Sequence, residues 1–337
     1  MYTAKRVNFK LIVTFGWRPF LFFLLYSFTI FALYEWLNWR FLPIPFVPVG
    51  VIGTAVAFYV GFKNNSSYER LWEARRIWGS IVNASRSWAI MVLDYPSLKN
   101  AAGDWTAERL AETKHDLIYY HLAYITALRV QLRQRTVWQQ HHDIAHAIVE
   151  RISAFKQCGL DKELSRFLDP AEIERLIRYQ NPATQLVRRQ SEELNRLREV
   201  GLLSSFHHVE MERLLVELYN QQGACERIKS FPFPRQYAFF SYVFVWLFLL
   251  VLPFGLLSEL VKASPQYAWL MVPIYVIIAW MFNTMEIVGD TSENPFENSL
   301  NDVPLTAICR NIEIDLREML GETNIPKRVE AVDNILM

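Results

Sequence analysis

One segment of the chain carries side chains at a spacing that could line an ion path. Thr54, Phe58 and Phe62 follow one another at intervals of four residues within the uncharged run Phe41–Phe62. Residues four apart lie on the same face of an α-helix. If several copies of this helix surrounded an axis, the three side chains would form stacked rings, and apolar rings can gate a pore by dewetting. The edge of a phenyl ring is positive, so rings seen edge-on would slightly favour an anion.

The same spacing also allows a simpler interpretation, in which the phenylalanines face lipid or pack between helices. The neighbouring face of the segment favours close helix packing, because Gly53, Ala57 and Gly61 also stand four residues apart. Small residues on one face let membrane helices approach each other closely. The spacing alone leaves both interpretations of the phenylalanines open.

Two other groupings have residue types that bind metals, and we expect neither to hold a metal. His142 and His146 are four residues apart, as in zinc proteases, but Asp143 stands where those enzymes have Glu, so we expect a solvated helix face. An acidic cluster follows the last apolar run, and we expect a solvated face or arginine partners for its members: Glu286, Asp290, Glu293 and Glu297. The sequence has neither a glycine-rich phosphate loop nor the GxSxG element of hydrolases, so we expect no enzyme.

The uneven distribution of charge predicts that the chain is a membrane protein. Hydrophobic residues make up 52% of the 337 residues, and charged residues only 20%, against about 25% in soluble domains. A helix of about 20 apolar residues spans a bilayer core. We therefore expect an all-α integral membrane protein with four transmembrane helices. Four runs are almost free of charge: Pro19–Tyr34, Phe41–Phe62, Gln236–Ser258 and Ala263–Met285.

These runs set the predicted organisation of the chain. The long segment between them is rich in Arg, Glu, Leu, Gln and Ala and poor in glycine, which is typical of helices. The predicted parts, in chain order, are an N-terminal segment with two transmembrane helices (1–62, with helices at about 16–39 and 41–62), a cytosolic helical domain (63–235), two further transmembrane helices (236–285, with helices at about 236–258 and 263–285) and a cytosolic C-terminal helical segment (286–337).

The positions of the basic residues predict the orientation in the membrane. Of the 35 Lys and Arg residues, 33 lie outside the two short links that join the paired apolar runs. Basic segments stay on the cytoplasmic side. We therefore expect a multi-pass protein of the cell (inner) membrane with both termini in the cytoplasm. The 35 basic residues nearly balance 34 acidic ones, so net charge gives no reason to expect nucleic acid as a partner.

Four motifs, in order along the chain, are similar to those of the bestrophin family. The run GFKNNSSYERLWEARRIWG (Gly61–Gly79) resembles the signature that ends the second span in bacterial bestrophins. The resemblance covers roughly residues 10 to 325, and four ordered motifs are far more specific than any one of them. The other three motifs are GACERI with FPF (Gly223–Ile228 and Phe231–Phe233), ENPF with NDVPL (Glu293–Phe296 and Asn301–Leu305) and CRNIEIDL (Cys309–Leu316).

The resemblance implies a homopentameric ion channel in the lipid bilayer, with four membrane helices per subunit and a helical cytosolic domain. A single central pore would run along the second span, and the family's neck residues map to Thr54, Phe58 and Phe62. Bacterial relatives commonly have aliphatic residues at the first two of these positions, so Thr54 and Phe58 depart from them. A second constriction, the cytosolic aperture, maps to Leu186, in the segment that follows Pro182.

Ion selectivity does not follow from the resemblance. Animal bestrophins pass chloride and other anions, whereas some bacterial members pass sodium. The phenyl rings of Phe58 and Phe62 favour chloride, and the second span contains no acidic residue that would attract a cation. Acidic residues elsewhere in the chain could still supply a cation path, so a sodium channel is the alternative.

The resemblance also bears on cofactors and on other classes of function. Animal members carry consecutive acids after the Asn-Pro-Phe motif, because calcium takes six to eight oxygen ligands. Here Leu300 interrupts that run and Asp302 remains alone at its end, so we expect no calcium clasp and no other cofactor. A secondary transporter is a weaker alternative, because such carriers often contain two repeats and four spans are few for two repeats. A membrane scaffold is another, and it predicts no conductance.

Overall fold

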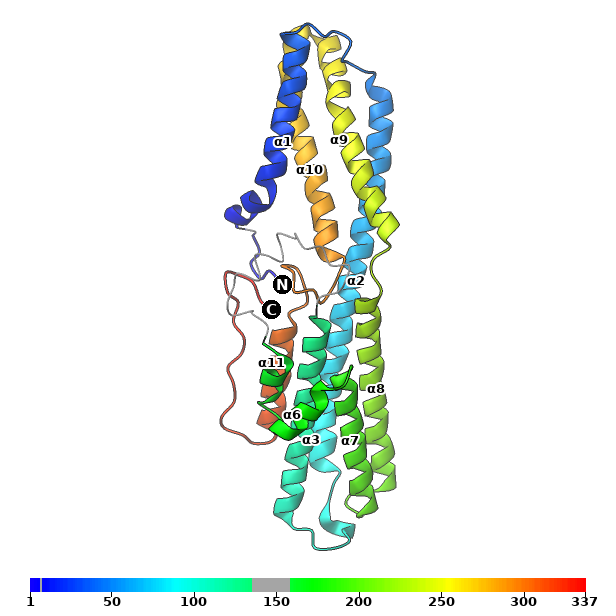
Figure 1. Cartoon of the computed structure of the whole chain (residues 1–337), viewed down its shortest axis with the longest axis vertical. Coiled ribbons are helices and arrows are strands. Elements are labelled where there is room, and N and C mark those ends of the chain that lie inside the picture. The colour runs from blue at the N-terminus through cyan, green and yellow to red at the C-terminus, as the bar shows by residue number, and fades with distance from the viewer. Residues whose placement is uncertain (7, 135–157) are drawn as a thin grey trace. The chain divides into compact units, whose positions relative to one another are not determined.

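The part of the chain that a computed structural model describes, residues 1–6, 8–134 and 158–337, is almost entirely helical (Figure 1). This confirms the predicted all-α fold class. His142 and His146 lie outside the described residues. The helices, in chain order, are α1 (Phe9–Glu35), α2 (Phe46–Asp94), η1 (Leu98–Asn100), α3 (Ala107–Leu132), α5 (Leu160–Leu164), α6 (Pro170–Ile177), α7 (Pro182–Glu199), α8 (Ser205–Ser230), α9 (Arg235–Ala263), η3 (Pro265–Leu270), α10 (Met271–Ser292) and α11 (Leu305–Met319).

In the described part of the chain, four helical segments are long and apolar enough to cross a membrane. The first of them ends at Glu35, before the predicted boundary at 39, and the backbone then turns at Asn38, whose φ is 60°. The second does not end near residue 62, because no proline or glycine interrupts the polar run that follows Phe62 until Gly79, and α2 continues to Asp94. The four segments are Gly16–Glu35, Phe46–Asp94, Arg235–Ala263 and Pro265–Ser292.

The described chain divides into two compact units, and α2 contributes residues to both. We name them for their contents. The membrane unit comprises Ala4–Leu71 and Pro232–Asn294, and so holds the apolar helices. The bundle unit comprises Met1–Thr3, Trp72–Phe231 and Pro295–Met337, and it holds the more polar helices.

Within the membrane unit, α10 packs against both α1 and α9 (Figure 1). The core between these helices is apolar and aromatic, with Phe23, Leu249 and Tyr275 buried. Helix α2 approaches α9 at Gly53, where a Cβ atom would lie 2.6 Å from Cε2 of Phe248. Because a side chain at this position would collide with the phenyl ring, glycine permits the close contact of the two helices.

Within the bundle unit, α3 is the central helix and packs against α7, α11, α5 and α8. Thr106 caps its N-terminus by accepting a hydrogen bond from the amide of Arg109 at 3.3 Å. His121 lies at the middle of α3 with no exposed surface. Its Nε2 atom is 3.0 Å from Oγ of Ser85 on α2, and its Nδ1 atom is 3.3 Å from Oε1 of Gln190 on α7. His121 therefore joins α2, α3 and α7 through two buried polar contacts.

Burial of His121 predicts that the stability of the chain depends on pH. Burial lowers the pKa of His121 to about 3, whereas an unfolded histidine has a pKa of about 6.5. The contribution is therefore fully present above pH 6.5 and is lost as the pH falls from about 6.5 toward 3, because only the unfolded chain takes up the proton. Between about pH 7.5 and pH 5.5 we expect a loss of about 1.4 kcal/mol in unfolding free energy from this residue.

Unfolding of the purified chain in detergent, followed at both pH values, measures this loss. His121→Gln removes the titrating group and should reduce the difference between the two pH values. The control is His115→Gln, since the His115 side chain is 45% exposed, and it should keep the wild-type difference. An equal pH dependence in the wild type and in His121→Gln would contradict the prediction.

Candidate functional site

The membrane part of α2 has one exposed face and one buried face, on opposite sides of the helix. The three predicted neck residues, Thr54, Phe58 and Phe62, share one exposed face. At 3.6 residues per turn this face is centred opposite the buried one. The buried face repeats at intervals of three and four residues and consists of Val49, Gly53, Val56, Val60, Lys63 and Ser67.

The neck face has a defined side-chain arrangement. The rings of Phe58 and Phe62 meet edge to face, with centroids 4.6 Å apart and an interplanar angle of 89°. Both side chains are largely exposed in the single chain, at 69% and 53%. The hydroxyl of Thr54 turns back and donates a hydrogen bond to the carbonyl oxygen of Gly50 at 3.0 Å. The helix thus presents an aromatic pair that the described residues leave largely exposed, and its role in a pore stays a prediction.

The three small residues differ in their surroundings. Gly53 packs against Phe248, as described above. Ala57 and Gly61 are exposed, and a Cβ atom on Gly61 would meet no atom within 4 Å. Within one chain, only Gly53 makes a close helix contact. A packing role for Ala57 and Gly61 stays a prediction that requires a second helix.

The structure places Leu186, the predicted cytosolic aperture, in the interior of one subunit. Leu186 lies in α7 with no exposed surface. It shares the buried face of that helix with Val187, Gln190 and Leu194, and α7 packs against α3. Leu186 therefore packs within its own subunit, and its role at a cytosolic aperture stays a prediction.

A buried charged cluster follows the neck face directly. Lys63 has no exposed surface, and its Nζ atom lies 2.5 Å from Oε1 of Glu286 and 2.5 Å from Oδ1 of Asp290. Ser241 donates a hydrogen bond to the second oxygen of Glu286 at 2.9 Å. The cluster joins α2, α9 and α10. The sequence analysis expected solvent or arginine side chains around the acidic cluster. The partner of Glu286 and Asp290 is instead a lysine.

Gly289 on α10 makes room for this cluster. A Cβ atom at this position would lie 2.3 Å from Oδ1 of Asn64 and 3.6 Å from Cε of Lys63. A Cβ atom there would require the Asn64 side chain to move. The glycine therefore leaves room for Asn64 beside the lysine that reaches the carboxylates of α10.

Two polar residues that the sequence analysis did not single out continue the neck face. Asn65 and Glu69 are exposed, and Nδ2 of Asn65 donates a hydrogen bond to Oε1 of Glu69 at 2.9 Å. Glu69 lies seven residues after Phe62, two turns along the same face. Following this face past Phe62 at 3.6 residues per turn, with a step of seven residues, would have found this acid, because the residues after Phe62 were expected to be helical.

Asp302 uses its oxygens to hold a loop. Its Oδ1 atom accepts hydrogen bonds from the amides of Phe296 and Val303 at 2.8 and 2.6 Å. Its Oδ2 atom accepts one from the amide of Asn298 at 2.7 Å. Among the described residues, no group of three or more His, Cys, Asp and Glu side chains is placed to hold a metal ion. The absence of a calcium clasp stays a prediction.

The buried cluster predicts a strong effect of removing Lys63. Lys63→Met keeps most of the side-chain volume but leaves Glu286 buried without its counter-charge. Breaking a buried ion pair in this way typically costs about 3–5 kcal/mol, so we expect a large fall in the thermal unfolding midpoint. The matched control is Lys262→Met, which removes the exposed pair of Lys262 with Glu259 and should cost about 0–1 kcal/mol. Equal effects of the two substitutions would refute the prediction.

Comparison with known proteins places this geometry in a family. The family model described as Bacterial/Fungal Bestrophin protein matches residues 11–318. The voltage-dependent anion channel-forming protein YneE of Escherichia coli (strain K12) is 28% identical over 305 residues, which cover 90% of this chain and 86% of the relative. The voltage-dependent anion channel-forming protein RSc3414 of Ralstonia nicotianae is 29% identical over 320 residues, which cover 92% and 89%.

Solved structures show the same fold. The crystal structure of a bacterial bestrophin homologue from Klebsiella pneumoniae matches with a TM-score of 0.74 and 24% sequence identity, and the match covers 90% of this chain and 98% of that chain. The family model spans most of the sequence, which confirms the resemblance found in its motifs. The chain is a membrane protein and belongs to the bacterial and fungal bestrophin family.

Proposed function

We propose that the chain is a subunit of an ion channel in which copies of α2 surround a central pore, and that the channel passes anions such as chloride. The observation that supports this most is the exposed row of Thr54, Phe58 and Phe62 on the face of α2 opposite its buried face. The relatives named as voltage-dependent anion channel-forming proteins support a channel that passes anions.

The exposed face of α2 changes character along the helix. Its apolar part continues toward the start of the helix with Val47 and Val51, which are also strongly exposed. Beyond Phe62 the same face becomes polar at Asn65 and charged at Glu69. In the proposed assembly the phenyl groups would form a ring, and such an apolar ring can control conduction by dewetting.

The number of copies and the orientation are parts of the same proposal. Family members assemble as pentamers, and we propose five copies here, with Ala57 and Gly61 facing neighbouring subunits. Small residues suit such contacts because they let helix backbones approach. We place the channel in the inner membrane with both termini in the cytoplasm, from the excess of basic residues outside the short links.

A sodium-selective channel is the second candidate, and Glu69 is the observation that favours it. Acidic rings line cation channels. Five copies of Glu69 at one end of the neck face would concentrate cations there. Each Glu69 accepts a hydrogen bond from the neutral Asn65, and within the described ranges no Lys or Arg forms an ion pair with it. The phenyl rings and this acid therefore pull selectivity in opposite directions.

The reversal potential of the purified protein in planar bilayers under a chloride salt gradient decides between the candidates. For an anion channel we expect reversal near the chloride potential, and Glu69→Gln should move it further in that direction. Reversal near the cation potential that weakens in Glu69→Gln would establish the alternative. We expect no change between low and high calcium, because both oxygens of Asp302 already accept backbone hydrogen bonds. No current under any condition would favour a transporter or a scaffold.

Phe58→Ala tests the neck itself. Removing the phenyl group widens the constriction and lowers the penalty for wetting it, so we expect a single-channel conductance several-fold higher and an altered anion-to-cation permeability ratio. Phe240→Ala is the matched control, since Phe240 is an exposed phenylalanine of α9 in the same unit. If Phe58→Ala changes conductance and permeability no more than the control does, Phe58 does not face the pore.

A further inference from the structure

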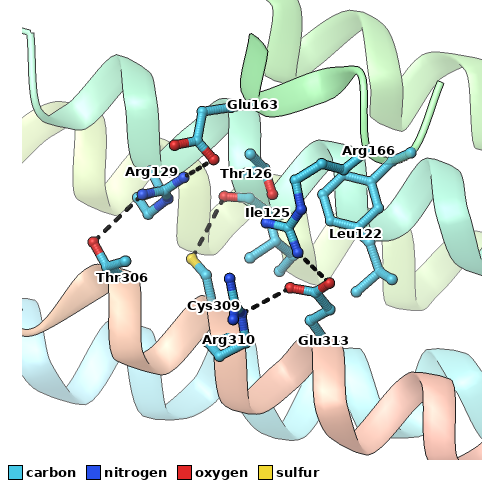
Figure 2. A pocket seen from close by; sticks show the side chains of 11 residues that line it. Leu122, Ile125, Thr126, Arg129, Glu163, Arg166, Thr306, Cys309, Arg310 and Glu313 are labelled. Carbon is cyan, nitrogen blue, oxygen red and sulfur yellow. Dashed lines mark hydrogen bonds and ion pairs between the residues drawn. The ribbon is translucent and has the colours of Figure 1, made fainter. Parts of the chain in front are cut away.

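We propose that the bundle unit binds a small oxyanion, a carboxylate or inorganic phosphate, in a pocket between α3, α11 and the segment that joins α5 to α6. Figure 2 shows this pocket, with arginine side chains entering it from all three elements. Neither the family assignment nor the proposed conduction of ions requires such a site.

The pocket is small and its lining is rich in polar groups. Its volume is about 80 Å³, comparable with two or three water molecules in the liquid. This is room for an anion of a few heavy atoms and too little for a nucleotide. The lining includes three arginines and two glutamates, which are Arg129, Arg166, Arg310, Glu163 and Glu313.

Positive charge exceeds negative charge around the pocket. Arg129 pairs with Glu163 at 2.7 Å. Glu313, by contrast, is shared: it pairs with Arg166, and Arg310 Nε approaches its other oxygen at 3.1 Å. Three guanidinium groups therefore face two carboxylates.

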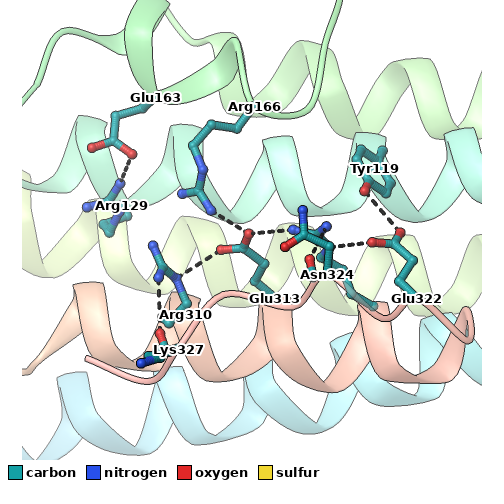
Figure 3. A network of polar contacts seen from close by, with 10 residues as sticks. Tyr119, Arg129, Glu163, Arg166, Arg310, Glu313, Glu322, Asn324 and Lys327 are labelled. Atoms are coloured by element: carbon teal, nitrogen blue, oxygen red, sulfur yellow. Dashed lines mark hydrogen bonds and ion pairs between the residues drawn. The ribbon is translucent and has the colours of Figure 1, made fainter. Parts of the chain in front are cut away.

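The surrounding network does not remove this excess. Arg317 also reaches Glu313, at 3.4 Å, and pairs with Glu322 at 2.6 Å. Tyr119 donates a hydrogen bond to the other oxygen of Glu322 at 3.0 Å (Figure 3). With these residues included, four arginines meet three glutamates. Burial raises the pKa of the Cys309 thiol to about 12, so Cys309 adds no negative charge to the pocket.

Hydrogen-bond donors are left over at the pocket. Nε of Arg129 is buried and has no hydrogen-bond partner among the described residues. A buried donor without a partner is costly, and a bound acceptor would relieve that cost. Arg166 binds Glu313 through Nη2, while its side chain stays 37% exposed. The planar fork of a guanidinium matches the paired oxygens of a carboxylate or phosphate.

Titration of the full-length purified protein in detergent tests the site. Inorganic phosphate and acetate are added separately at constant ionic strength, with chloride as the reference salt, and the thermal unfolding midpoint is followed. A ligand that binds only the folded state raises the midpoint with its concentration. We expect a saturable rise with phosphate or with acetate beyond that in chloride, and the stronger of the two identifies the class of oxyanion.

Arg166→Gln removes one donor fork and should weaken the apparent affinity at least tenfold. Arg178→Gln is the matched control, because Arg178 directly follows α6 in the same unit, is 74% exposed and pairs only with Glu174 among the described residues. Its affinity should stay at the wild-type value. Arg129→Gln is a second test and should also weaken binding. Each variant is first compared with the wild type in chloride, so that only folded proteins enter the titration.

Three results would overturn the proposal. One is the absence of any rise with either oxyanion beyond that in chloride. Another is a rise that never saturates, which would mark a general effect of salt. The third is equal affinity in wild type, Arg166→Gln and Arg178→Gln. Because the readout is binding and not current, failure here leaves the proposed channel function untouched.

Discussion

The architecture of the membrane unit depends on one buried ionic contact, in which Lys63 reaches two carboxylates on another helix. A lysine without exposed surface is tolerated only because Glu286 and Asp290 balance its charge and Ser241 satisfies a further oxygen. The contact fixes the rotation of α2 about its own axis. Since Lys63 faces inward, the preceding Phe62 and Phe58 must face outward. The same contact therefore holds the aromatic pair on an exposed face.

Patterns with a simple period could be predicted from the sequence. Four uncharged runs gave four apolar helices, and the four-residue spacing of Thr54, Phe58 and Phe62 placed them on one face of α2. The ends of helices were less predictable, because Trp36, Leu37 and Trp39 are as apolar as a span, yet the chain turns at Asn38. The partner of Lys63 could not be predicted either, since Glu286 lies 223 residues away and nothing local connects the two.

In the bundle unit, the positions of several residues depend on tertiary packing that the sequence pattern does not reveal. Leu186 follows Pro182 by four residues, and the family resemblance suggested that it forms an aperture. In the structure its side chain is buried, on a helix that packs against α3. Helical register alone could not decide whether the exposed or the buried side of α7 carried Leu186. The pocket of three arginines could not be predicted from the sequence either, because Arg129, Arg166 and Arg310 come from three separated segments of the chain with unrelated spacing.

The hydrogen bond of Thr54 has a consequence for the chemistry of the proposed pore. Its hydroxyl proton is committed to the carbonyl of Gly50, so the side chain offers the axis only oxygen lone pairs and a methyl group. A ring of such threonines could accept from a cation's hydration shell but could not solvate chloride. At the proposed Thr54 ring an anion would keep its hydration shell. Any preference for anions would therefore have to arise at the rings of Phe58 and Phe62.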